Sequence, residues 1–259
     1  MTPAEPPKEH DPVQWFSDHF DDAAQQVIDF ISADGIKLEG ATIADIGSGD
    51  GIIDLGVALK AHPAKLVGYD VKPADLGALA RSMAAAGVAE GLPDSETLAF
   101  LQSEVDHVPA PNDTFDVVYS WSVFEHVAEP VEMLREIHRI LKPEGVFFLQ
   151  LWPFFYSQHG GHLWLSIEEP FAHLCRSLFA IEQDLRSEPA TDPSRPADDE
   201  FRSLNRLTLD GLQRALLAAR LRIAKIELIA EAAHIPPSLA HLPVGDLAVS
   251  GVKLLAVPF

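Results

Sequence analysis

The apolar positions along this chain fall into short runs that alternate with stretches of helical spacing. The runs predict seven strands, at 42–46, 65–69, 98–101, 115–119, 146–151, 222–229 and 252–257. The first five are nearly continuous in apolar residues, which is typical of parallel strands buried on both faces. Between runs, apolar residues recur every three or four positions, as in 131–141. The pattern therefore predicts an α/β fold, a Rossmann-like seven-stranded mostly parallel sheet with helices on both faces.

The same pattern divides the chain into parts of one domain, 1–259. We expect an N-terminal helix at 12–33, a core at 41–152, an insertion or lid at 153–205, and a closing helix and two strands at 206–259. Within these parts the sequence also predicts a turn at 142–145, helices at 170–179 and 209–221, and a mobile surface loop at 182–202. The insertion breaks the alternation of strands and helices, so we place it on the substrate side.

Charge and cysteine content narrow the class of protein. The chain has 39 Asp and Glu residues against 19 Lys and Arg residues, a formal net charge of −20, which disfavours nucleic acid and anionic membranes as partners. Cys175 is the single cysteine, so the chain forms no intramolecular disulfide and no cysteine-based metal cluster. The first residues lack the pattern of a secretory signal, and no apolar run is long enough to span a bilayer. These features predict a cytoplasmic protein.

A glycine-rich loop follows the first predicted strand. Gly47, Gly49 and Gly51 lie at the start of a helix, where exposed amides can bind an anionic or polar ligand. Asp70 ends the second predicted strand, nineteen residues after Gly51. A carboxylate at this position can accept two hydrogen bonds from the hydroxyls of a ribose. Loop, strand and acid together predict a nucleoside cofactor.

The spacing of the glycines distinguishes between cofactors. A dinucleotide fingerprint requires Gly or Ala at the position of Ile52, whereas the third glycine, Gly51, comes one residue earlier. The run from Asp45 to Gly51 resembles motif I of the class I S-adenosylmethionine-dependent methyltransferases. The similarity continues through Asp70, Ser103-Glu104-Val105, the segments 113–118 and 120–127, and the turn before the fifth strand. Arg220 departs from the family, whose members commonly have glycine before the sixth strand.

The resemblance implies S-adenosylmethionine as cofactor, a reversed last hairpin in the sheet, and a set of binding residues. The resemblance assigns cofactor contacts to Asp45, Gly47, Ser48, Gly49, Gly51, Asp70, Val71, Glu104, Val105, Ser120 and Trp121. In this set Asp70 holds the ribose, Glu104 and Val105 face the adenine, and Ser120 with Trp121 lie near the sulfonium. Trp121 is equally well explained by core packing. For Asp45, the alternative is a structural role in orienting the amides of the loop.

Transfer to a hydroxyl requires a proton acceptor, and histidine is the commonest choice. We select His126, His159 and His162 as catalytic residues, with Glu125 and His173 as further possibilities. Phe154, Phe155, Tyr156 and Trp164 around the histidines could form an aromatic platform for the acceptor. Glu168, Glu169 and His173 are metal-ligand types near the two insertion histidines, but their spacing matches no specific motif, so we predict no metal site.

Weaker similarity of 153–165 and 204–208 to bacterial enzymes of glycan biosynthesis suggests the acceptor. The reaction expected is methyl transfer (EC 2.1.1 class) to a hydroxyl of a sugar or glycosylated metabolite. The alternatives are an N-methyltransferase of a small amine, an NAD-linked oxidoreductase, and a non-catalytic nucleoside-binding partner protein. The sequence does not indicate the oligomeric state.

Overall fold

The computed structural model describes residues 11–163, 167–187 and 201–259. Seven strands form one sheet in the order β3-β2-β1-β4-β5-β7-β6. Their bounds are β1 Thr42–Ile46, β2 Lys65–Asp70, β3 Leu98–Gln102, β4 Phe115–Trp121, β5 Leu141–Leu151, β6 Leu221–Ala230 and β7 Val249–Pro258. β1 to β5 pair in parallel, and β7 is antiparallel to both β5 and β6. The predicted fold class, including the reversed last hairpin, is confirmed.

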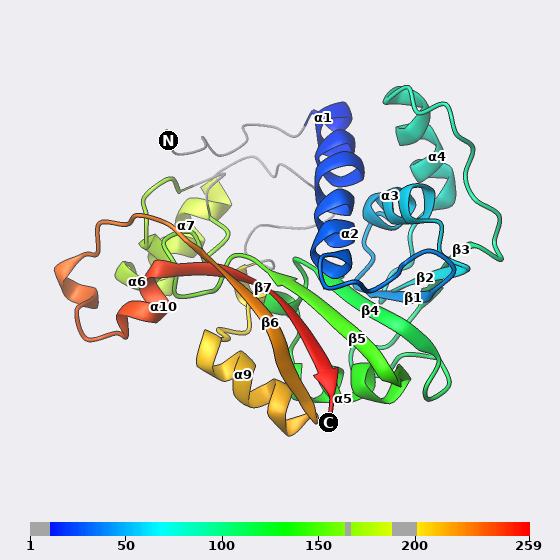
Figure 1. The fold of residues 1–259 in the computed structure, drawn as a ribbon. Coiled ribbons are helices and arrows are strands. Elements are labelled where there is room, and N and C mark those ends of the chain that lie inside the picture. Colours follow the sequence, from blue (N-terminus) through cyan, green and yellow to red (C-terminus); the bar gives the residue numbers. More distant parts are fainter. Residues whose placement is uncertain (1–10, 164–166, 188–200) are drawn as a thin grey trace.

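Helices cover both faces of the sheet (Figure 1). One layer contains α1 (Pro12–Ser17), a π-helical turn η1 (Asp18–Ala23), α2 (Ala24–Ser32), α3 (Ile52–Ala61) and α4 (Leu76–Ala85); the other contains α5 (Pro130–Ile140) and α9 (Leu209–Ala218). Successive strand residues serve opposite layers: Val117 and Tyr119 of β4 belong to the first core and Val118 to the second. In the described part of the chain, no helix combines the length and apolar character that crossing a membrane requires.

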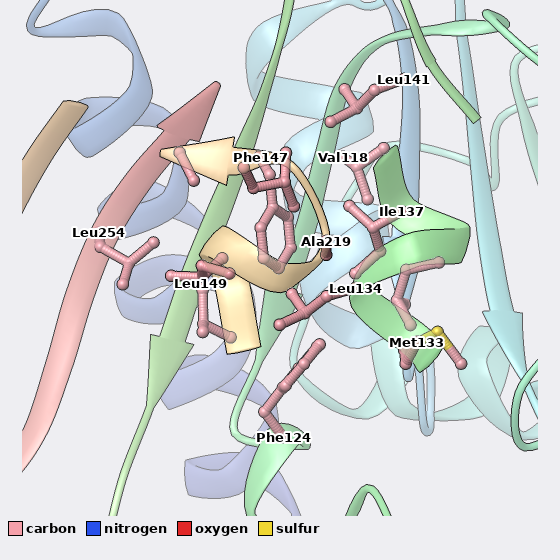
Figure 2. Close-up of a cluster of buried hydrophobic side chains, with 14 of the residues drawn as sticks. Val118, Phe124, Met133, Leu134, Ile137, Leu141, Phe147, Leu149, Ala219 and Leu254 are labelled. Carbon is pink, nitrogen blue, oxygen red and sulfur yellow. The ribbon is translucent and has the colours of Figure 1, made fainter. Parts of the chain in front are cut away.

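The core under α5 and α9 extends beneath the turn that follows β4. Phe147 and Leu149 of β5 pack with Leu134 of α5, and Phe124 of the short helix η2 (Phe124–His126) joins the same cluster (Figure 2). Phe124 is fully buried. Burial of such a side chain stabilises its position by about 1.5–3 kcal/mol, so it holds the turn firmly against the sheet.

The insertion has a small core of its own. Phe155, Ile181, Leu185 and Phe201 are buried in it, together with residues of α6 (Ala172–Cys175). A second contact joins the insertion to the connection between β6 and β7, which holds η3 (Pro237–Leu239) and α10 (Val244–Ala248). The helices α6, α7 (Leu178–Ser187) and α10 gather beyond one end of the sheet (Figure 1).

Three local predictions are wrong. The predicted turn 142–145 is a bulge within β5, because Phe115 pairs with Leu141 whereas Val117 pairs with Val146. The predicted helix 170–179 is two helices, α6 and α7, with Arg176 extended between them. The predicted mobile loop 182–202 begins inside α7, where Leu185 is buried. Residues 188–200 of that loop, and Trp164, lie outside the described residues.

Arg220 links α9 to β6 in a left-handed backbone conformation, with φ +59°. Its amide donates to the carbonyl of Leu217 at 3.1 Å, and its side chain is exposed. This is the position after a helix where glycine is favoured, because a Cβ atom there is strained.

We expect Arg220→Gly to raise the free energy of unfolding by up to about 1 kcal/mol. Relief of left-handed strain of about 1–2 kcal/mol outweighs the greater chain entropy of glycine in the unfolded state. Chemical denaturation measures the effect. Arg220→Ala removes the same side chain but keeps the strain, so an equal gain in that variant would contradict the backbone explanation.

Candidate functional site

The two segments with the strongest sequence signals meet at one place in the sheet. β1 and β4 are neighbours, but the chain visits β2 and β3 on the far side of β1 before it reaches β4. At such a switch point the connections leave in opposite directions and open a crevice at the carboxyl ends of the strands. The glycine loop follows β1 there, and residues 122–126 follow β4.

Gly47 allows the two segments to touch. It has φ +86°, and a Cβ atom added to it would lie 2.5 Å from a methyl carbon of Val123. Its amide donates to the carbonyl of Tyr69 at 2.7 Å. Gly51 is also left-handed, at φ +79°, and a Cβ there would lie 2.5 Å from the ring of Phe100. Side chains are therefore excluded on both sides of the loop.

Asp70 reaches this loop directly. Its Oδ2 accepts a hydrogen bond from the amide of Gly49 at 3.1 Å, and its Oδ1 accepts one from the amide of Lys72 at 2.9 Å. A carboxylate has about four acceptor positions, so these two bonds leave capacity for the hydroxyls of a ligand. The structure thus brings the loop and its spaced acid together.

The N-terminal helix also contacts the loop. Trp15 of α1 donates from its indole Nε1–H to Oδ2 of Asp50 at 2.9 Å. The other oxygen of Asp50 accepts from the amide of Ile52 at 3.1 Å, at the start of α3. Asp50 therefore joins the glycine loop, α3 and α1, a link that spacing along the chain did not reveal.

The remaining residues assigned to the cofactor lie around the crevice in different settings. Val71 and Val105 are 53% and 70% exposed, and Glu104 is exposed as well. Ser120 is fully buried and donates its hydroxyl to the carbonyl of Ile46 at 2.7 Å. Trp121 is half-buried and lies 6.4 Å from the ring of Phe148, as core packing requires.

Two buried acids lie behind the loop. Asp45 and Asp54 are 3% and 0% exposed, and the Tyr119 hydroxyl donates to Asp54 at 2.8 Å. Burial raises the pKa of Asp45 well above its usual range, and the charge of Asp54 raises it further. Burial also raises the pKa of Asp54 to about 7. Asp54 and Tyr119 were missed by sequence reasoning, although an acid within the apolar first turns of α3 was a usable signal.

The loop meets the requirements of a polar cofactor. Among the described residues, Oδ1 of Asp45 and Oγ of Ser48 are buried atoms that have no hydrogen-bond partner. Unsatisfied buried polar atoms are costly, and a ligand that supplies donors removes that cost. Together with the glycine cradle and the spare acceptor positions of Asp70, these atoms fit the cofactor that the sequence predicts.

At the turn after β4, three side chains of acid–base type converge. One ligand-type atom each of Glu125, His126 and His162 lies within 4.8 Å of the others. The rings of His126 and His162 are 5.1 Å apart, and Nδ1 of His126 is 2.7 Å from the Ser203 hydroxyl. The structure therefore brings together two of the three predicted catalytic histidines, His126 of η2 and His162 of the insertion.

Asn205 holds this turn in place. Its backbone amide donates to the carbonyl of Glu125 at 2.8 Å. Its side-chain Nδ2 donates to the carbonyls of Phe124 and Val127 at 2.5 and 2.8 Å. Asparagine is suited to this because one side chain supplies two donors and an acceptor. The end of the insertion is thus fastened to the turn after β4.

For His173, Phe154 and Phe155, the structure gives different roles from those expected. His173 is a weak base, because burial lowers its pKa to about 4, and its Nε2–H donates to the carbonyl of Phe155 at 2.6 Å. Phe154 and Phe155 do not form an exposed platform, since they are 3% and 7% exposed within two cores. His159 is half-buried, and its charge contributes to lowering the pKa of His173.

Residues 44–149 match the family model described as a methyltransferase domain. The matched segment is less than half of the chain and contains the glycine loop, Asp70 and the turn after β4. The "Ubiquinone biosynthesis O-methyltransferase" of Pseudomonas paraeruginosa is 33% identical over 112 residues, 43% of this chain and 44% of that protein. The chain thus spans less than half the length of this curated relative.

Solved structures share the fold of this chain over a longer span. An S-adenosylmethionine-dependent methyltransferase from Mesorhizobium loti has a TM-score of 0.55 and 17% identity, over 92% of this chain and 99% of that one. The cyclase SpnF also has a TM-score of 0.55 and 17% identity, over 91% and 81% of the two chains. Likeness at this identity concerns the fold, so the chemistry must be argued from the site.

We expect Asp54→Asn to flatten the pH dependence of stability. The pKa of Asp54 is raised from 3.8 to about 7 on folding, so the folded chain keeps a proton that the unfolded chain loses. Stability from this group is therefore complete below pH 3.8 and is lost as pH rises through about 7. Thermal unfolding at several pH values from 4 to 8 measures the slope.

Asparagine keeps an acceptor for Tyr119 and has no charge to lose. Asp22→Asn is the matched control, because Asp22 is an exposed acid on η1. Equal slopes for the wild type and Asp54→Asn would show that this buried pair does not govern the pH response.

Proposed function

We propose that this chain transfers a methyl group from S-adenosylmethionine to a hydroxyl of a small molecule, with a sugar or glycosylated metabolite as the favoured acceptor. The observation that carries the proposal is the contact of Asp70 with the glycine loop at the switch point of the sheet. The whole chain acts as one domain, in which the insertion covers the acceptor side. Its free, exposed Cys175 suits a reducing cytoplasm.

Different residues around the loop bind different parts of the cofactor. Asp70 accepts hydrogen bonds from the ribose hydroxyls, and Glu104 with Val105 faces the adenine, next to Val71. The methionine part lies against the loop and its buried acid. The residues assigned to it are Asp45, Gly47, Ser48, Gly49, Gly51 and, nearest the sulfonium, Ser120 and Trp121. When bound, the cofactor supplies a methyl group that its positive sulfur already activates.

The chain's own contribution is alignment and removal of a proton. An acceptor oxygen must lie in line with the methyl carbon and the sulfur, and a rigid crevice supplies that orientation. A hydroxyl has a pKa far above 7, so a group near it must accept or replace its proton. Glu125 and His126 follow Val123, which lies against Gly47 of the loop, and together with His162 they are suited to this task.

The alternatives remain separable by experiment. Ile52 occupies the third position of a dinucleotide fingerprint and is 4% exposed, which disfavours an NAD-linked oxidoreductase. An N-methyltransferase of a small amine would use the same loop with an acceptor that needs no strong base. A non-catalytic nucleoside-binding partner protein would bind the cofactor and transfer nothing.

We expect Asp70→Ala to weaken the affinity for S-adenosylhomocysteine by a factor of about 10 to 150. Hydrogen bonds to a charged group contribute about 1.5–3 kcal/mol. Calorimetric titration measures the affinity, and Glu90→Ala is the control because it removes an equal charge from an exposed position away from the loop. Unchanged affinity in Asp70→Ala would show that the ribose binds elsewhere.

Incubation of the enzyme with a cell extract and methyl-labelled cofactor identifies the acceptor. Mass spectrometry should find the label on an oxygen of a small polar metabolite, and the signal should fall with the cofactor-deficient Asp70→Ala variant. Label found only on amines would instead support N-methylation. No label despite cofactor binding would support the non-catalytic alternative.

A further inference from the structure

The acceptor side contains a set of metal-ligand side chains that the sequence did not group. Glu125 and His126 belong to η2, whereas His162 comes from the insertion. Their ligand-type atoms all lie within 4.8 Å of one another. Ligands bound to one zinc ion at about 2.0–2.2 Å lie about 3 to 4 Å apart, so small side-chain rotations would close the set around a cation.

The donor types select a class of metal. Two imidazoles and one carboxylate suit first-row divalent cations such as zinc, iron or manganese, whereas magnesium and calcium prefer oxygen ligands alone. Three protein ligands leave at least one coordination position open, which is the arrangement of reactive rather than structural metal sites. Glu125 is 4% exposed and both histidines are half-buried, so the set is shielded from solvent.

Three residues in and beside this set have a left-handed backbone conformation, which indicates that their surroundings hold them in place. His162 has φ +54°, and Ser122 and Arg206, which flank the other segments of the cluster, have φ +49° and +57°. Non-glycine residues in this left-handed region are strained, and such a conformation persists only where the surroundings impose it. Ser122 is held by Gln150, whose Oε1 accepts from its amide and hydroxyl at 2.9 and 2.7 Å.

The loop that carries His162 is equally constrained. A Cβ atom on Gly160 would lie 2.2 Å from the carbonyl oxygen of Phe154, and one on Gly161 would lie 2.7 Å from His173. These glycines let the loop pack flat, with His162 turned to His126. The close packing of these glycines therefore restricts the position of the loop that carries His162.

An outer partner is present for one ligand. Nδ1 of His126 is 2.7 Å from the Ser203 hydroxyl. When His126 binds a cation through Nε2, its Nδ1 carries the proton and donates it to that hydroxyl, as outer partners of metal-bound histidines do. Ser203 and Asn205 would therefore orient both members of η2 from the same short segment.

We propose that Glu125, His126 and His162 bind a divalent transition-metal ion. The metal site stands by itself; its use in catalysis rests on the proposed methyl transfer. There the cation would bind the acceptor hydroxyl and lower the pKa of that oxygen, with the proton released to water. The oxygen–methyl bond then forms as the methyl–sulfur bond breaks, giving a methyl ether and the neutral thioether product.

The test is metal titration of tag-free protein that has been stripped with a chelator and desalted. Calorimetry with Zn²⁺, and Mn²⁺ binding followed by electron paramagnetic resonance, should give one site per chain. Glu125→Gln and His162→Asn should each weaken binding at least about tenfold. His234→Asn is the matched control, because it removes an exposed histidine outside the cluster, and it should bind like the wild type.

Circular dichroism and the affinity for S-adenosylhomocysteine show whether each variant is folded with an intact cofactor site. Absence of saturable binding in the wild type, or equal binding in both cluster variants and the wild type, would overturn the metal site. Methyl transfer that is insensitive to the chelator would overturn its catalytic use. Metal binding without methyl transfer would leave the site standing and contradict the proposed function instead.

Discussion

The close approach of the loop after β1 to the loop after β4 is the constraint on which the site depends. Gly47 has no side chain, so Val123 can lie directly against it. A larger residue would separate the glycine loop from the turn that carries Glu125 and His126. Because both loops follow neighbouring parallel strands, the sheet sets their direction, and this single contact sets their distance.

Two different kinds of support act on the two sides of that contact. The loop side is held by backbone hydrogen bonds to β2 and by Asp50, which links it to the N-terminal helix. The opposite side is held by the buried ring of Phe124 and by the amide of Asn205. Glycine geometry and charge therefore define one side, whereas core packing and a distant segment of chain define the other.

The sequence predicted most of the architecture because its signals are local. Apolar runs marked all seven strands, and the glycine loop with Asp70 placed the crevice at the end of β1. The splitting of α6 from α7 was not predictable, because Arg176 carries no obvious break signal. The contacts of Asp54 with Tyr119 and of His162 with His126 were not predictable either. In both, the two residues are far apart in the sequence, and residue spacing indicates only contacts between near neighbours.

The insertion has a core that is separate from those of the sheet. Elements that bury their own side chains can open as a unit while the remainder stays folded. A cavity made at Ile181 or Leu185 would therefore act first on the order of the loop around His162 and only weakly on global unfolding. Backbone amide exchange in this part of the chain would then report on the order of the loop around His162, independently of the melting temperature of the whole molecule.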